Sequence, residues 1–206
     1  MIRVSGRINE QVLITDEAIG PRANWREIFG NDRPVQIEIG PGKGTVLLHL
    51  ARVFANHNFL GIEWARAFYR YAGRRMTYWN VDNVRMLRTD AREFVVDRVG
   101  SQSLLAVHAY FPDPWPKKRH QKRRLFIPEF CAALGRVLVP GGKVLFATDH
   151  EEYFARSREN LLAVKTFRES DPNELAGRSL EGIESNYQAK FAKEGRTIYR
   201  LAVEKV

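Results

Sequence analysis

The chain has 206 residues, of which 44% are hydrophobic and 28% are charged, and its net charge is +9. This length and composition suit a single folded domain, and the one cysteine, Cys131, excludes an internal disulfide or a thiolate zinc site. No apolar run reaches the roughly 18 residues of a membrane span and no signal segment opens the chain, so we expect a soluble, cytoplasmic protein without a metal.

Short apolar runs alternate with helical patterns along the chain. The patterns predict strands at 35–39, 59–63, 84–87, 104–111, 144–148 and 196–203, and helices at 45–54, 64–78, 127–138 and 153–162. This alternation predicts an α/β, Rossmann-like fold, with a single mostly parallel sheet and helices on both faces. We expect one domain over residues 1–206, with 1–34 as an N-terminal extension and 35–206 as the core.

A glycine-rich turn follows the first predicted strand. Glu38 precedes Gly40, Gly42 and Gly44, in a spacing that differs from the dinucleotide fingerprint and from the phosphate loop. A carboxylate beside a phosphate would repel it, but a carboxylate accepts hydrogen bonds from an ammonium. The turn therefore predicts a ligand with an amino-acid moiety and no phosphate, such as S-adenosylmethionine. The alternative is an ordinary tight turn.

Two more acidic residues end the next two predicted strands. Glu63 is placed to accept from ribose hydroxyls, and Asp90 from an adenine amino group, while Trp64 offers an apolar wall for the ring. An acid at the end of a single strand is more often a helix cap, and Asp90 precedes a predicted helical turn. Three acids at three successive strand ends favour a cofactor site.

The segment Phe111–Arg124 follows the fourth predicted strand. Its prolines restrict the backbone on both sides of Asp113 and around Trp115, which predicts a rigid loop that presents a hydrogen-bond acceptor and a stacking surface. Lys117–Arg124 then holds six basic residues and no acidic one, which predicts a polyanionic partner. The alternative is a proline-rich turn followed by a solvated charge run.

With these motifs the sequence resembles the bacterial tRNA (guanine-N7-)-methyltransferases from about Val35 to the C-terminus. The long signature F-P-D-P-W-x-K-x-R-H-x-K-R-R is matched without exception by Phe111–Arg124. Shorter family motifs match at 38–44, 61–63, 90–91 and 148–149. The resemblance implies a Rossmann-like S-adenosylmethionine-dependent methyltransferase fold, with tRNA as substrate.

The resemblance also implies roles for individual residues. Asp113 is the implied catalytic residue, and the implied S-adenosylmethionine site comprises Glu38, Gly40, Gly42, Gly44, Glu63, Asp90 and Asp113. The implied tRNA contacts are Arg119, His120, Gln121, Lys122, Arg123 and Arg124. The implied guanosine contacts are Lys117, Asp149, Ser185 and Gln188. At the last two positions the family has T-x-x-E, so this chain keeps a hydroxyl and loses a charge.

The expected target is a guanine outside a regular duplex. Guanine N7 carries a lone pair and no proton, so its methylation requires alignment rather than a base. The deep major groove of A-form RNA hides N7, which favours a guanine in the variable loop of tRNA.

Other features leave alternatives open. Arg66, Arg70 and Arg74 form a stripe on a predicted helix, which is typical of a solvated face and less often of an RNA contact. Residues 171–195 have little periodicity and predict a flap that orders on RNA. A non-catalytic RNA-binding module with a degenerate methyltransferase fold is the alternative function, and a monomer or a homodimer is compatible with the sequence.

Overall fold

The computed structural model describes residues 8–183, 191 and 193–206. Its residues fall into two compact units, Met1–Gly100 and Ser101–Val206.

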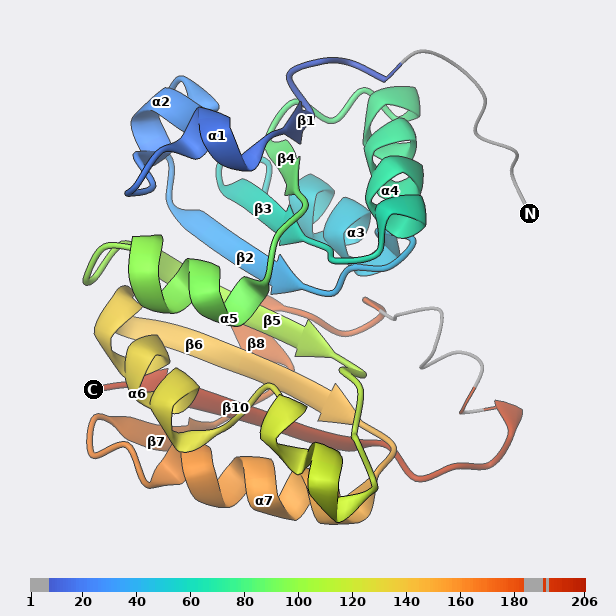
Figure 1. The fold of residues 1–206 in the computed structure, drawn as a ribbon, viewed down its shortest axis with the longest axis vertical. Helices are drawn as coiled ribbons and strands as arrows, with labels where there is room; N and C mark the ends of the chain where they lie inside the picture. The colour runs from blue at the N-terminus through green and yellow to red at the C-terminus, as the bar shows by residue number, and fades with distance from the viewer. Residues whose placement is uncertain (1–7, 184–190, 192) are drawn as a thin grey trace. The chain divides into compact units, whose positions relative to one another are not determined.

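The first unit is built on four parallel strands in the order β1-β4-β3-β2 (Figure 1). The strands are β1 (Leu13–Ile14), β2 (Val35–Ile39), β3 (Asn58–Ile62) and β4 (Val84–Leu87). The whole of β3 and the first four residues of β2 are buried. Burial on both faces is expected of parallel strands covered by helices.

The helices of this unit lie between its strands and after the last of them. They are α1 (Asp16–Ile19), α2 (Trp25–Phe29), α3 (Thr45–Val53), α4 (Arg66–Tyr78), α5 (Ala91–Glu93) and a π-helical turn, η1 (Phe94–Arg98). Most of α3 is apolar, and Leu47 and Leu50 on this helix are fully buried. The crossover from β2 through α3 to β3 places the glycine turn at the carboxyl end of β2, as in other open α/β sheets.

The second unit mixes parallel and antiparallel pairing. Its strands β5 (Leu104–Tyr110) and β6 (Leu138–Thr148) are parallel, whereas β10 (Tyr199–Lys205) pairs antiparallel with β6 and with β7 (Phe167–Ser170). Helices α6 (Pro128–Val137) and α7 (Glu151–Leu162) lie on one side of these strands, and η2 (Lys118–Arg123) is a 3-10 helix (Figure 1). A small hairpin joins β8 (Glu174–Leu175) to β9 (Arg178–Ser179).

Most predicted elements are confirmed with shifted ends, and β6 differs most. It begins at Leu138 instead of residue 144, so Pro140 and Gly141 lie in a strand where a helix stop was predicted. Both residues are exposed near the strand's start, a position that tolerates proline. The pairing shifts register between Leu104 and Ala106. The short elements β1, β7, β8, β9, α1 and α2 were not predicted.

Candidate active site

The glycine turn of the first unit has the backbone that its sequence requires. Gly40, Gly42 and Gly44 have φ angles of +67°, +54° and +68°, a left-handed region that favours glycine. At Gly44 a side chain would also clash, because an added Cβ would lie 2.9 Å from Cε of Met76 and 3.2 Å from Cβ of Ala72. The turn therefore packs directly against α4.

Glu38 lies in β2 just before this turn and is 3% exposed. Burial raises the pKa of its carboxyl group to about 8, and the negative charge of Glu63 adds to the rise. Its Oε2 has no hydrogen-bond partner among the described residues. A buried oxygen without a partner is costly, so this atom is suited to accept from a ligand's ammonium group.

Glu63 is held by the backbone around it. Its Oε2 accepts from the N–H of Gly42 at 3.0 Å, and its Oε1 accepts from the N–H of Ala65 at 2.8 Å. The carboxylate thus ties the glycine turn to the end of β3. A carboxylate has about four acceptor positions, so these two bonds leave capacity for ribose hydroxyls.

Asp90 caps the helix that follows β4. Its Oδ1 accepts from the N–H groups of Arg92 at 2.8 Å and Glu93 at 3.2 Å. The structure therefore shows the helix cap that the sequence allowed, and an adenine contact stays a prediction. Trp64 is 68% exposed, with the guanidinium of Arg88 5.9 Å from its ring centroid.

The proline-rich loop of the second unit has strained backbone on both sides of its acidic residue. Phe111 and Trp115, which each precede a proline, have φ angles of +56° and +44°. Such angles cost of order 1–3 kcal/mol for residues other than glycine, and they persist where the surroundings enforce them. Asp113 lies between the two positions and is exposed. The loop therefore presents Asp113 in a constrained conformation, as its prolines predicted.

The basic run forms η2, in which residues three apart share a face. His120 and Arg123 lie on one face and contact Trp115, with ring centroids 5.8 Å apart for His120 and the Arg123 guanidinium 5.0 Å from the ring. Arg119 and Lys122 lie on another face and are exposed. This second face is open to an RNA backbone.

For Arg124 the structure gives a role different from the expected tRNA contact. Arg124 is 4% exposed, so its guanidinium has almost no surface for a phosphate. Its Nε donates to the carbonyl of Pro114 at 2.8 Å, its Nη atoms donate to Glu152, and the guanidinium lies 5.1 Å from the ring centroid of Tyr153. Arg124 therefore joins the Asp113 loop to the start of α7.

Asp149, one of the expected guanosine contacts, follows β6. Its Oδ2 accepts from Nη1 of Arg196 at 2.8 Å, and Arg196 also pairs with Glu194 at 2.9 Å. The guanidinium of Arg196 lies 4.5 Å from the ring centroid of Phe191. Lys117 is exposed at the start of η2. Ser185 and Gln188 lie outside the described residues, as does part of the predicted flap.

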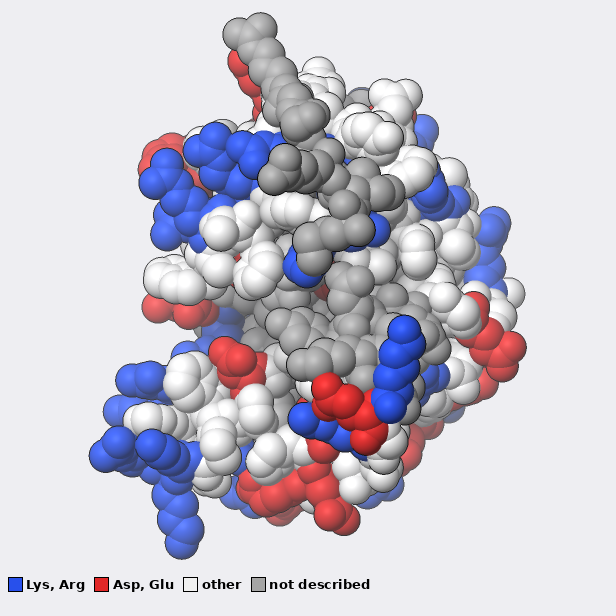
Figure 2. Space-filling model, turned by 90° about the vertical axis from the view of Figure 1, so that its right-hand side faces the viewer, with Lys and Arg blue, Asp and Glu red and all other residues white. Residues whose placement is uncertain are grey.

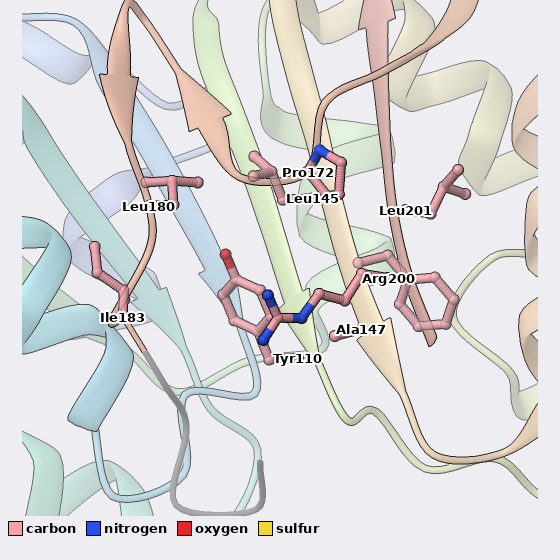
Figure 3. Close-up of a pocket in the computed structure, with 9 residues that line it drawn as sticks. Tyr110, Leu145, Ala147, Pro172, Leu180, Ile183, Arg200 and Leu201 are labelled. Atoms are coloured by element: carbon pink, nitrogen blue, oxygen red, sulfur yellow. The ribbon is translucent and has the colours of Figure 1, made fainter. Parts of the chain in front are cut away.

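The second unit also contains a pocket, which is lined by Tyr110, Leu145, Phe146, Ala147, Pro172, Leu180, Ile183, Arg200 and Leu201 (Figure 3). Tyr110 and Arg200 both pair in register with Ala147, so their side chains flank it on one face of the strands. The hydroxyl of Tyr110 lies 2.9 Å from Nδ1 of His108, whose pKa burial lowers to about 3. The sequence did not single out Tyr110 or Arg200, because alternation along one strand does not show which residues of neighbouring strands pair with each other.

The described residues contain no group of three His, Cys, Asp or Glu side chains that could hold a metal ion. Over the same part of the chain, no helix has the length and apolar character needed to cross a membrane.

Comparison with known proteins identifies the family. Residues 32–201 match the family model described as "Putative methyltransferase". The tRNA (guanine-N(7)-)-methyltransferase of Geobacter metallireducens is 35% identical over 93% of this chain and 92% of its own length. The enzyme of that name from Listeria monocytogenes is 37% identical over 87% of this chain and 84% of its own length. The chain belongs to the tRNA (guanine-N7-)-methyltransferase family.

Similar solved structures show that this chain has the fold of S-adenosylmethionine-dependent methyltransferases. A methyltransferase of this class from Aquifex aeolicus matches with a TM-score of 0.56 and 13% identity over 85% of both chains. The aminoglycoside resistance methyltransferase NpmB1 matches with a TM-score of 0.55 and 15% identity over 93% of this chain and 91% of its own. These matches confirm the predicted fold class.

The residues of this family member fit the cofactor. S-adenosylmethionine carries an ammonium group and two ribose hydroxyls but no phosphate. Glu38 offers a buried oxygen without a partner among the described residues, and the glycine turn allows the backbone to approach a ligand closely. The carboxylate of Glu38 would not suit a phosphate, because it would repel it when ionised.

Proposed function

We propose that this chain forms N7-methylguanine in tRNA with S-adenosylmethionine as the methyl donor. The observation that carries the proposal is the match to tRNA (guanine-N(7)-)-methyltransferases over about nine-tenths of the chain, with identities of 31–37%. The unbroken signature at Phe111–Arg124 and its constrained loop support it.

Cofactor binding is assigned to the first unit. Glu38 accepts from the ammonium of S-adenosylmethionine, Glu63 accepts from the ribose hydroxyls while it holds the turn, and Asp90 accepts from the adenine amino group. The glycines at 40, 42 and 44 let the backbone approach the ligand. When bound, the cofactor supplies a methyl group activated by the adjacent sulfonium.

Guanine binding is assigned to the second unit, where Asp113 is the catalytic residue. N7 needs no deprotonation, so Asp113 holds the base in line by hydrogen bonds and stabilises the positive charge that the purine gains. Lys117, Asp149, Ser185 and Gln188 hold the guanosine. When the guanosine binds, Asp149 either exchanges its bond to Arg196 for a bond to the guanosine or keeps both bonds.

Binding of the tRNA backbone is assigned to the exposed cations of η2. Arg119, Lys122 and Arg123, with His120 and Gln121, position the RNA without reading its sequence. The target is the guanine of the variable loop, which is accessible without opening a regular duplex. Because tRNA is the substrate, the site of action is the cytoplasm.

A single assay tests the activity. The protein is incubated with methyl-labelled S-adenosylmethionine and unmodified tRNA, and the product is treated with borohydride and aniline, which cleave the chain at N7-methylguanine. Label in the tRNA together with cleavage in the variable loop supports the proposal. Label without cleavage means methylation at another atom and contradicts it.

The alternative is an RNA-binding module that has lost the cofactor, for which the loss of a charge at Gln188 is the supporting observation. Calorimetry with S-adenosylmethionine separates the two, since the module predicts no binding.

A further inference from the structure

Helix α4 has one tightly packed face and one open face. Ala72, Gly73 and Met76 are buried, and a Cβ at Gly73 would lie 2.4 Å from Cδ2 of Leu13. On the other side, Arg66, Arg70, Arg74 and Tyr78 follow one another at intervals of four residues. Arg66 and Arg70 are exposed, Arg74 is half-buried, and Tyr78 is 57% exposed. Residues four apart lie one above another on a helix, so these side chains form a continuous stripe.

The stripe has no compensating acid. Residues 64–81 contain four arginines and no aspartate or glutamate. Arg75 is used inside the unit, where its Nη1 donates to Oγ1 of Thr45 at 2.7 Å and to the carbonyl of Lys43 at 3.3 Å. Within the described part of the chain, no ion pair joins the three stripe arginines to an acid. Together, residues 64–81 and the basic run Lys117–Arg124 hold ten lysines and arginines and no acidic residue, so the rest of the chain has a net charge of −1.

Exposed aromatic rings flank the stripe at both ends. At the N-terminal end, Trp64 is 68% exposed and lies beside Arg88. At the C-terminal end, Trp79 is 37% exposed, with the guanidinium of Arg52 4.6 Å from its ring centroid and the ring of Tyr78 5.4 Å away, edge to face. Large exposed aromatics are unusual on a solvated helix. Together with arginines they are typical of surfaces that stack unpaired bases.

We propose that the exposed face of α4, defined here as Arg66, Arg70, Arg74 and Tyr78 with Trp64 and Trp79 at its ends, is a second tRNA-docking surface. It is separate in sequence from η2, and the inference rests on the proposed function. The arginines span about 12 Å along the helix at 1.5 Å per residue, enough to contact successive phosphates of one strand. The aromatic rings then stack bases that are not paired.

Other occupants of this face fit it less well. A second copy of the chain would bring like charges together on an isologous interface. A simple solvated face explains the arginines but not the aromatic rings at both ends. Figure 2 shows lysine and arginine side chains gathered in groups on the face of the molecule that it displays, some of them beside acidic side chains.

The position of α4 within its unit links docking to the cofactor turn. The helix begins three residues after Glu63, whose carboxylate bonds Gly42, and Arg75 on the helix bonds the backbone at Lys43. A tRNA bound along α4 therefore lies on an element that packs against the turn that we assign to the cofactor.

The test compares two triple variants of equal charge change. In Arg66→Gln/Arg70→Gln/Arg74→Gln the stripe is neutralised. In the control, Arg22→Gln/Arg26→Gln/Arg33→Gln, three exposed arginines elsewhere in the first unit are neutralised. The dissociation constant of unmodified tRNA is measured at several salt concentrations, with tRNA methylation kinetics and S-adenosylmethionine calorimetry on the same proteins.

The stripe variant is expected to bind tRNA about tenfold more weakly than the control. Its plot of log K against log salt is expected to have a slope smaller by about 2, since each phosphate contact contributes about 0.7–0.9 to the slope. Its KM for tRNA rises, while kcat and cofactor affinity stay within about twofold. Equal tRNA affinity and salt slope in the two variants would overturn the docking surface. Absence of methylation by the unaltered chain would instead overturn the proposed function. The two failures are distinguishable, because the binding measurement does not depend on turnover.

Discussion

The guanidinium of Arg124 donates to both carboxylate oxygens of Glu152, at N–O distances of 2.9 and 2.5 Å. This hydrogen-bonded pairing raises the pKa of Arg124 and lowers that of Glu152. The same guanidinium donates to the carbonyl of Pro114, the residue after Asp113. Because a planar guanidinium bonds a carboxylate at two points, it fixes orientation as well as distance. Arg124 thereby sets the position of the loop that carries Asp113.

Replacement of Arg124 should therefore affect turnover more than tRNA binding. We expect Arg124→Gln to lower kcat at least tenfold and to reduce the free energy of unfolding by about 1–3 kcal/mol. This loss of stability is smaller than that for a fully buried ion pair, because Glu152 is 58% exposed. Arg123→Gln, one position away but exposed, is the matched control and should raise the dissociation constant of tRNA with little change in kcat. Single-turnover kinetics, tRNA binding and urea unfolding measure the three quantities. If Arg124→Gln behaved like the control, the positioning role would be refuted.

Arg123 and Arg124 also show where prediction from sequence ends. Both belong to one basic run, and nothing in its composition separates an exposed cation from a buried one. The turn of η2 directs Arg123 toward Trp115 and Arg124 into the unit. That difference depends on Glu152, which lies 28 residues later in the chain.

The hydrophobic periodicity of the sequence predicted the strands and helices that position the site, but not the contacts that their side chains make. The predicted strands place Glu38 near the end of β2, Glu63 directly after β3 and Asp90 at the start of α5, as the structure has them. The bonds of Glu63 to Gly42 and Ala65 depend on tertiary structure, so sequence spacing could not reveal them. Strands of two residues, such as β8, are too short to show a period.

Removal of the Asp113 carboxylate should abolish methyl transfer and leave tRNA binding largely intact. Asp113 is exposed, so Asp113→Ala and Asp113→Asn should both fold. We expect kcat to fall by at least two orders of magnitude in Asp113→Ala, because the guanine loses both its alignment and its charge stabilisation. Asp113→Asn keeps a hydrogen-bonding group without the charge, and its residual rate separates the two contributions. Methylation at the unaltered rate by Asp113→Ala would exclude the catalytic role.

The exposed face of η2 should contribute to the salt dependence of tRNA binding. Arg119 and Lys122 lie on the solvent side of this 3-10 helix. We expect Arg119→Gln/Lys122→Gln to weaken tRNA binding and to make the plot of log K against log salt shallower by about 1.5. Binding titrations at several salt concentrations measure the slope. An unchanged slope would show that these cations do not meet phosphates.

Glu38 should make the stability of the protein depend on pH. Its pKa in the folded chain is about 8, against an ordinary value of 4.5, because burial disfavours the charged carboxylate. Between these two values the folded chain holds more protons than the unfolded chain, so the free energy of unfolding falls as pH rises. The favourable contribution of the protonated carboxyl group is complete below pH 4.5 and is lost above about pH 8.

Glu38→Gln keeps the shape of the protonated acid and cannot ionise. We therefore expect this variant to match the unaltered protein near pH 5 and to be more stable by a few kcal/mol above pH 8, at the order of about 1.4 kcal/mol per pKa unit. The exposed Glu17→Gln serves as control and should give an offset that does not change over this range. Urea unfolding from pH 5 to pH 9 checks the divergence, and parallel curves for Glu38→Gln and the unaltered protein would contradict it.

Binding of S-adenosylmethionine at pH 7 should also release a proton from Glu38, because an ammonium requires the ionised carboxylate. The release is measured as a binding heat that varies with the ionisation enthalpy of the buffer. This variation should be absent in Glu38→Gln.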